Sequence, residues 1–266
     1  MAKILSKRNI GHCAFLLFLI INVSSAAISA SSQSTQQPRY VDGVESIIQS
    51  HQYVQQTPAL TYWKVSPYYL SQRNESSCSL ASATMLVNAA RSNQTLVADQ
   101  PLATQDSLLN LVKDKTWEEG VKVDGNGVTL DQMKSFVPKA LEAYGLHNFT
   151  VEVIHTQDSS GEHALKLHKA LLDMENSGQS FIIANFNQKF ISGTMSVGHF
   201  APLGAYDSKT KRVLIMDPDR ILFEPYWVPE KRFLESMATM DEDAHKSRGY
   251  LLIKMLPEHS RTTKPQ

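Results

Sequence analysis

The order of the periodic segments constrains the fold of this chain more than any other feature. Helical patterns come first, over about 78–91, 129–144 and 163–177. Strand-like apolar runs follow at 181–186, 199–206, 212–217 and 250–256. Helices early and strands late indicate an α+β fold, with a helical N-terminal part packed on a C-terminal antiparallel sheet.

Local signals add detail to this outline. Asp207 to Lys211 is short and polar, so the strands on either side should form an antiparallel hairpin. Thr129 and Gln132 make a capping box at the start of the second helix. Pro138 lies inside that helical pattern, and we expect it to kink or split the helix. The aromatic-rich stretch 40–70 predicts irregular packing.

The first 30 residues read as a signal peptide. Lys3, Lys7 and Arg8 precede an apolar run of about ten residues, and small residues follow as cleavage candidates. The run is shorter than the about 20 apolar residues that span a bilayer comfortably, although a retained signal anchor stays open. Cys13 precedes the run, on the wrong side for lipid modification after cleavage. We therefore expect an exported protein, secreted or periplasmic, with no membrane association after cleavage.

After cleavage the chain is long enough for one domain with a substantial core. We expect a flexible lead-in at 31–39, where the sequence is polar, one domain over 40–257, and a flexible tail at 258–266. The chain has 26 basic and 26 acidic residues; removing three basic ones with the leader leaves 23 against 26, a net charge near −3. Nothing here indicates nucleic-acid binding. The oligomeric state is open, with a homodimer as one option.

Cys78 would then be the sole cysteine of the mature protein. It stands where a polar run changes abruptly into an apolar-periodic helix, at or near the helix N-terminus. Free N–H groups and the helix dipole favour a thiolate there. The alternative is a buried free cysteine that acts as a small apolar residue. A lone thiol in an oxidising compartment favours a functional role.

Three further residues complete a chemical set. His199 opens the first strand of the predicted hairpin and Asp217 closes the second, so the hairpin brings them together. An aspartate in that place can hold an imidazole in one tautomer and direct its other nitrogen at a thiol. Gln72 precedes Cys78 by six residues, and its amide can donate to an oxyanion. Such a set is typical of papain-like thiol acyl transfer.

The local sequences resemble those of the phytochelatin synthase family. Segment 196–206 (SVGHFAPLGAY) is similar to that family's glycine–His–Phe–Ser–Pro segment, and 214–220 with 225–229 to its Asp–x–x–Arg and Pro–x–Trp–Val elements. Gln72 through Ser82 is similar to its Gln-to-Cys element, with Ser79 where a glycine is usual. The resemblance covers about 60–256 and implies a papain-like cysteine protease fold.

The resemblance also implies roles. Cys78 would be the nucleophile, His199 the general base and acid, Asp217 its orienter and Gln72 the oxyanion donor. The family cleaves the Cys–Gly bond of glutathione, holds γ-glutamylcysteine as a thioester, and passes it to another glutathione or to water. No tightly bound cofactor is implied. A divalent soft metal such as Cd or Zn would enter as a thiolate complex of glutathione.

Candidates for substrate binding are less distinctive. Arg220 can bind a carboxylate, or it can pair with Asp219 or Glu224. Asn185 and Asn187, on the strand that leads to His199, are candidates to donate to the γ-glutamyl group, and Gly198 is a further candidate for substrate binding. Protein-bound metal is not expected: the histidines at 163 and 168 are five residues apart, where ligands on one helix face need four.

The sequence departs from the eukaryotic pattern of the family. It shows no Cys-rich C-terminal extension, and Leu222 and Glu224 replace a lysine and a proline. We expect a single-domain, exported, bacterial-type member in which hydrolysis competes with transfer. Asn74 begins a formal glycosylation sequon four residues before Cys78, where a glycan would crowd the proposed site. We therefore interpret the sequon as accidental, which favours a bacterial periplasmic setting. The alternatives are a thiol peptidase acting on other γ-glutamyl or peptide substrates, and a non-catalytic protein that binds thiols or metal thiolates.

Overall fold

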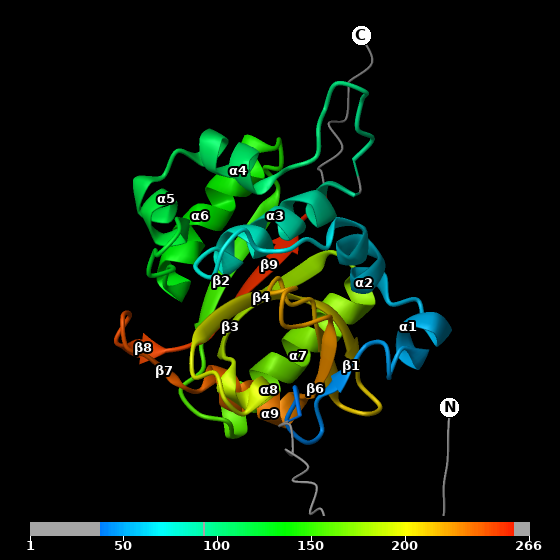
Figure 1. Ribbon diagram of the computed structural model, residues 1–266. Helices are drawn as coiled ribbons and strands as arrows, with labels where there is room; N and C mark the ends of the chain where they lie inside the picture. Colours follow the sequence, from blue (N-terminus) through cyan, green and yellow to red (C-terminus); the bar gives the residue numbers. More distant parts are fainter. Residues whose placement is uncertain (1–37, 93, 258–266) are drawn as a thin grey trace, which may run out of the picture. The chain divides into compact units, whose positions relative to one another are not determined.

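A computed structural model describes residues 38–92 and 94–257 of the chain (Figure 1). The chain divides into two units, 1–37 and 38–266, and all described residues belong to the second. The predicted signal peptide, most of the predicted lead-in and the predicted tail therefore lie outside the described residues. Among the described helices, none has the length and apolar character needed to cross a membrane.

The centre of the fold is a seven-stranded antiparallel sheet in the order β1-β6-β5-β4-β3-β9-β2. Its strands are β1 (Glu45–Ser46), β2 (Phe149–His155), β3 (Ser180–Asn187), β4 (Gly198–Asp207), β5 (Arg212–Ile215), β6 (Tyr226–Pro229) and β9 (Gly249–Met255). A small hairpin of β7 (Met240–Asp241) and β8 (Lys246–Ser247) stands apart from the sheet. The strands β4 and β3 lie in its middle and, with the neighbouring β9, are buried along most of their length.

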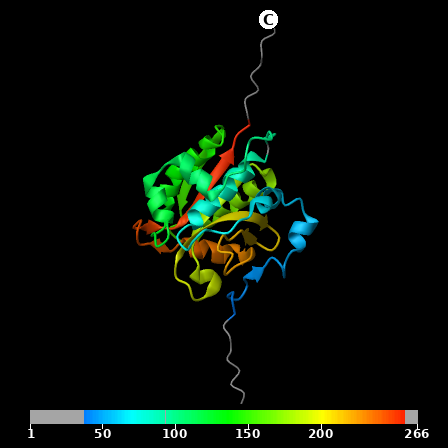
Figure 2. The ribbon, with the colours of Figure 1, turned by 45° about the horizontal axis from the view of Figure 1, so that its top comes forward.

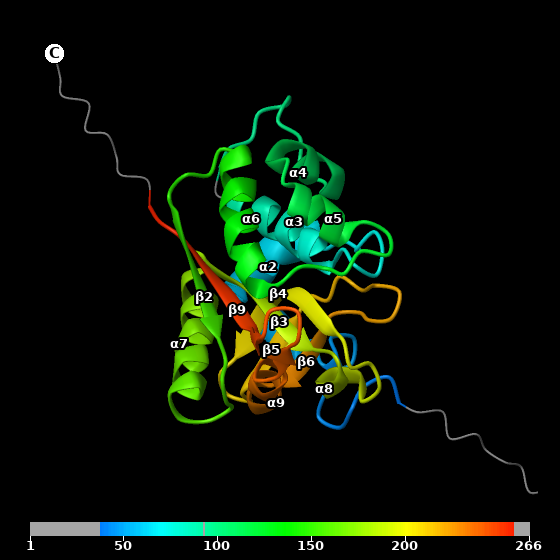
Figure 3. The ribbon, with the colours of Figure 1, turned by 90° about the vertical axis from the view of Figure 1, so that its left-hand side faces the viewer.

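Helices cover both faces of the sheet (Figures 1 and 3). They are α1 (Gln52–Gln56), α2 (Leu60–Val65), a 3₁₀ turn (Ser66–Tyr68), α3 (Cys78–Arg91), α4 (Gln105–Val112), α5 (Lys115–Val121), α6 (Leu130–Ala143), α7 (Gly161–Ser177), α8 (Lys189–Ser192) and α9 (Glu230–Met237). Figure 3 shows α3 to α6 gathered on one side and α7 and α9 on the other. In the tilted view of Figure 2, α3 crosses directly over the middle strands.

The strand alternation produces two hydrophobic cores. Ile183 and Phe200 face the core beneath α3, whereas Ala184 and Ala201 face the core beneath α7 and α9. Successive side chains of a strand point to opposite faces, so a strand covered on both sides is mostly apolar on both. This is why β3 reads as the apolar run FIIA at 181–184, followed by the buried polar Asn185 and by Phe186, rather than as an alternating pattern.

Helix α3 is buried around its whole circumference, from Cys78 to Arg91. Its polar side chains are therefore paired inside the protein. The Ser82 hydroxyl donates to the Phe200 carbonyl at 3.1 Å, and Asn88 exchanges two hydrogen bonds with the Ala103 backbone at 2.8 and 2.9 Å. The small residues in its first turns let the helix backbone approach β4 closely, which positions Cys78 against the sheet.

The predicted α+β fold is confirmed, with three corrections of detail. Pro138 does not split α6, because packing of Met133, Val137 and Leu141 holds the helix and the proline lies at its half-exposed side. The strand predicted over 212–217 is β5, which ends at Ile215. Asp217 therefore lies beyond the strand, and its carboxylate bonds His199. The stretch 40–70 contains the short helices α1 and α2 as well as irregular chain.

Candidate active site

Cys78 is the first residue of α3 and is 7% exposed. The preceding Ser77 does not cap the helix with its side chain in the described structure. Its hydroxyl instead accepts hydrogen bonds from the backbone N–H groups of Arg73 and Asn74, at 2.9 and 3.0 Å. The N–H groups of the first turn therefore stay available beside the sulfur, where a negative charge is stabilised by the helix dipole.

His199 and Asp217 form a buried pair at the end of the hairpin. The Nε2 atom of His199 lies 2.7 Å from Oδ1 of Asp217, and the two residues are 4% and 0% exposed. His199 is the second residue of β4, and Asp217 lies two residues after the end of β5. The ring of Phe186, directly across the ladder, meets the imidazole edge-on at 5.6 Å between centroids. This contact and the ion pair fix the plane of the imidazole.

The thiol of Cys78 lies beside the imidazole, close enough to contribute to the raised pKa of His199. Because Nε2 is held by Asp217, Nδ1 is the nitrogen left for the sulfur. Burial by itself would lower the pKa of His199, but the charge and hydrogen bond of Asp217, with the neighbouring Cys78, raise it to about 10. An imidazolium beside a sulfur stabilises a thiolate electrostatically. The three residues therefore have the contacts that a nucleophile, a proton carrier and its orienting carboxylate require.

Asp217 is held at three further points. The hydroxyl of Tyr226 donates to its Oδ2 at 2.6 Å, and the backbone N–H of Asp219 to its Oδ1 at 2.8 Å. The hydroxyl of Tyr69 donates to its main-chain carbonyl at 2.6 Å. Burial raises the pKa of Asp217, but the charge of His199 and the hydrogen bonds to the carboxylate outweigh it, so that the pKa is lowered. The side chain of Asp217 therefore faces His199 in its charged, carboxylate form.

Gln72 lies beside the same loop. Its backbone N–H donates to the carbonyl of Pro218 at 2.8 Å, so the chain before Cys78 is attached to the chain after Asp217. The side-chain oxygen of Gln72 is buried and has no hydrogen-bond partner among the described residues. Cys78, His199 and Asp217 are thus brought into mutual contact, and Gln72 is brought to the edge of this group.

The substrate-binding candidates are placed differently from one another. Asn185 is 2% exposed on β3, on the face that Ile183 presents to α3, and its side-chain oxygen is unpaired within the described structure. Arg220 is exposed and lies over the ring of Tyr69 at 4.7 Å. Glu224, one of its two alternative partners, pairs with Arg39 at 2.8 Å instead. Arg220 and Tyr69 both line a surface cavity of about 160 Å³ beside the Asp217 loop.

Gly198 stands next to a residue that the sequence did not single out. A Cβ at Gly198 would lie 3.0 Å from the guanidinium carbon of Arg248, so a larger residue here would make this arginine shift. Arg248 is held by Asp241 at 3.2 Å, and its Nε is buried and unpaired within the described chain. Tyr226 was missed as well. Neither has a sequence signal of its own: Arg248 is an isolated arginine before a strand, and Tyr226 reads as a core aromatic.

No group of three or more metal-ligating side chains occurs in the described parts of the chain. His168 contacts Glu230 and Tyr206 on the face of the sheet beneath α7 and α9. Its Nδ1 hydrogen-bonds the Glu230 carboxylate and the Tyr206 hydroxyl, so this histidine has a structural role.

Comparisons with known proteins agree with the geometry. The family model of phytochelatin synthase matches residues 42–250. Among curated relatives, glutathione gamma-glutamylcysteinyltransferase 1 of Lotus japonicus is 25% identical over 73% of this chain and 36% of its own length. The enzyme of the same name from Arabidopsis thaliana is 30% identical over 39% of this chain and 20% of its own. That of Schizosaccharomyces pombe is 26% identical over 50% of this chain and 29% of its own.

The chain thus spans about a third or less of the length of these relatives. The match to the family model nevertheless covers most of the described residues, including Gln72, Cys78, His199 and Asp217. The catalytic domain of this family is papain-like, as the helices on an antiparallel sheet show here. This chain belongs to the phytochelatin synthase family, whose members act on glutathione.

Proposed function

We propose that this protein cleaves the Cys–Gly bond of glutathione through a γ-glutamylcysteinyl thioester on Cys78. The observation that carries the proposal is the contact of Cys78 with His199 and of His199 with Asp217, at the start of a buried helix. Family membership and the relatives' names supply the substrate class.

The first half of the reaction forms the thioester. The sulfur of Cys78 attacks the carbonyl carbon of the cysteinyl residue, and the developing oxyanion is stabilised by the N–H groups at the start of α3 and the amide of Gln72. His199 delivers its proton to the glycine nitrogen as the C–N bond breaks. Glycine leaves, and His199 is neutral beside the charged Asp217.

The second half returns the enzyme to its starting state. His199 takes a proton from water or from the amine of a second glutathione, which attacks the thioester carbonyl. Water gives γ-glutamylcysteine; the amine gives a dimeric phytochelatin. A soft divalent metal takes part as a component of the substrate, bound to the glutathione thiol.

Two arginines fit the carboxylates of glutathione. Arg248, paired with Asp241, lies in space against Gly198, the residue before the proton carrier His199, and suits the donor, together with Asn185. Arg220 lies at the cavity on the outer side of the Asp217 loop and suits the acceptor. Arginine recognises carboxylates through paired N–H donors, which makes both assignments specific.

One assay tests the proposal. Purified protein is incubated with glutathione, with and without Cd²⁺ or Zn²⁺, and products are resolved by mass spectrometry. We expect release of glycine and an adduct of γ-glutamylcysteine mass on the peptide that contains Cys78. Release of glutamate rather than glycine would indicate a different γ-glutamyl peptidase, and binding of glutathione without any product would indicate a non-catalytic thiol-binding protein.

Export remains a proposal that rests on residues 1–30 alone. It predicts that protein recovered from the periplasm or medium of an expressing bacterium begins near residue 31. N-terminal sequencing measures this directly, and a cytosolic protein that keeps Met1 would contradict it.

A further inference from the structure

Residues 71–77, the segment before Cys78, are held from outside by the first turn of α4. We propose that Gln105 of α4 is a positioning residue for Gln72, and that it sets the oxyanion donor by fixing the peptide bond between Ser71 and Gln72. The inference rests on the proposed function, because it assigns Gln72 the part of a donor in thioester formation.

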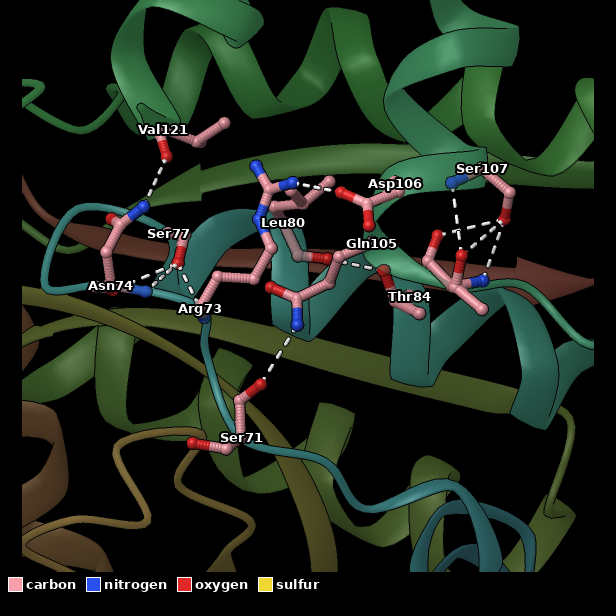
Figure 4. A network of polar contacts seen from close by, with 11 residues as sticks. Ser71, Arg73, Asn74, Ser77, Leu80, Thr84, Gln105, Asp106, Ser107 and Val121 are labelled. Carbon is pink, nitrogen blue, oxygen red and sulfur yellow. Dashed lines mark hydrogen bonds and ion pairs between the residues drawn. The ribbon is translucent and has the colours of Figure 1, made fainter. Parts of the chain in front are cut away.

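The Ser71–Gln72 peptide bond is gripped on both sides. Its carbonyl, from Ser71, accepts a hydrogen bond from Nε2 of Gln105 at 2.9 Å. Its N–H, from Gln72, donates to the carbonyl of Pro218 at 2.8 Å. Figure 4 shows the side chain of Gln105 reaching from α4 to Ser71. This one peptide unit therefore connects α4 with the loop that carries Asp217.

A second contact fixes the next residue. Arg73 makes an ion pair with Asp106, which follows Gln105 in the first turn of α4 (Figure 4). The start of α4 is itself fixed by a reciprocal capping box between Thr104 and Ser107. Two successive residues of a capped helix thus hold two points around Gln72.

The other side of Gln72 is fixed by the turn that leads into α3. Ser77 accepts from the N–H groups of Arg73 and Asn74, and the side-chain nitrogen of Asn74 donates to the Val121 carbonyl at 3.1 Å. These contacts, also visible in Figure 4, prevent the turn from shifting towards solvent. The backbone on either side of Gln72 is therefore held by side chains of α4 and, through the side chain of Asn74, by a main-chain carbonyl of α5.

The side chain of Gln72 lacks such support. Its Oε1 is buried without a hydrogen-bond partner among the described residues. An amide whose own oxygen is not held depends on its backbone for its direction. A donor displaced from an oxyanion loses stabilisation of the transition state and not of the bound substrate, since the negative charge exists only in the former. Loss of the Gln105 contact should therefore lower kcat and leave KM nearly unchanged.

The variant Gln105→Glu tests this most sharply. Glutamate has the size of glutamine and is favoured in the first turn of a helix, so α4 should remain stable. It cannot donate to the Ser71 carbonyl when ionised. Complete removal of an oxyanion donor costs about 10²–10³ in kcat, and we expect displacement to cost about tenfold. Gln100→Ala is the matched control, since Gln100 also hydrogen-bonds a backbone group, the N–H of Val97, but does so in the exposed loop before α4.

A double-mutant cycle separates positioning from general structural damage. In a Gln72→Ala background, Gln105→Glu should have little further effect on kcat, because the group that it positions is gone. Equal losses in both backgrounds would overturn the inference. So would a wild-type kcat in the single variant, while glycine release by the wild type would still support the proposed function.

Hydrogen exchange gives a readout that does not need turnover. The N–H of Gln72 should exchange faster in Gln105→Glu than in wild type or Gln100→Ala. Without the Gln105 hydrogen bond to the Ser71 carbonyl, the same peptide unit is held only by the bond to Pro218, which should open more often. Unchanged protection of this peptide would contradict the positioning role, whether or not the protein acts on glutathione.

Discussion

The two halves of the candidate site are built in different ways. His199 and Asp217 belong to a β hairpin in the middle of the sheet, are almost fully buried, and contact groups that are buried as well. Residues 71–76, before Cys78, alternate between exposed and half-buried and are held by single hydrogen bonds between side chains and backbone. The proton-transfer half is thus enclosed, whereas the half that must admit a substrate lies at the surface and depends on local polar contacts.

The largest expected effect is that of Cys78→Ser. The serine hydroxyl is far less acidic than the thiol, so formation of the acyl-enzyme should be abolished. The fold should persist, since the two side chains differ by one atom. Turnover of glutathione and the adduct mass measure the effect. Thr84→Val in the same helix is the control and should remain active; an active Cys78→Ser protein would refute the assignment.

The enclosed half should show a graded response. His199→Ala removes the group that transfers protons, which contributes about 10²–10⁴-fold to the rate. Asp217→Asn removes only the carboxylate that orients the imidazole and stabilises its charged form. We expect both to lower kcat and His199→Ala to lower it more. Circular dichroism must show both variants folded. Full activity of Asp217→Asn would give Asp217 a structural role only and direct attention to Asp219.

The ion pair also predicts a pH dependence of stability. The raised pKa of His199 contributes stability that is fully present below its ordinary value, near 6.5, and is lost as the pH rises to about 10. The lowered pKa of Asp217 contributes stability that is lost as the pH falls below its ordinary value of 3.8. The difference in free energy of unfolding between wild type and Asp217→Asn should therefore shrink from pH 6.5 to 10. Urea titrations across this range measure it, and a constant difference would contradict the pairing.

Tyr226→Phe should have a smaller effect. It removes a buried hydrogen bond to a charged carboxylate, which is typically a loss of about 1.5–3 kcal/mol of stability. Without this bond the pKa of Asp217 should rise, so acid destabilisation should begin at a higher pH. Tyr250→Phe is the matched control, since the hydroxyl of Tyr250 is buried but unpaired within the described residues. Equal losses in the two variants would show that Tyr226 acts only by packing.

The smallest effect is expected at the surface cavity beside Arg220. Leu222 is 42% exposed there, and Glu224, paired with Arg39, is partly neutralised. We expect γ-glutamylcysteine and glycine as the main products at low glutathione. Leu222→Lys should raise the share of dimeric phytochelatin about twofold, the scale of one exposed ion pair. Val97→Lys, on an exposed loop, is the control. Long phytochelatins from the wild type at low substrate would contradict this prediction.

Much of the fold was predictable because its signals are local. The helix from Cys78, the capping box at Thr129 and the hairpin around Asp207 to Lys211 all appear in the structure. Helices α4, α5 and α9 and strand β2 were not predicted. Their sequences are short or mixed, and their stability comes from packing on elements that are distant in the chain, such as α6 and β9.

The groups of the site and the place of each on its own element follow from the sequence: a thiol at a helix start, and an imidazole and a carboxylate at the open end of a hairpin. Helix periodicity, strand alternation and turn composition act over a few residues, so the sequence displays them directly. The contact of the thiol with the imidazole, the bond from Tyr226 to Asp217, and the positions of Gln105 and Arg248 beside the site come instead from long-range packing. Those contacts depend on how α3, α4 and β9 pack around the sheet, and this packing is set by the whole core rather than by any one segment.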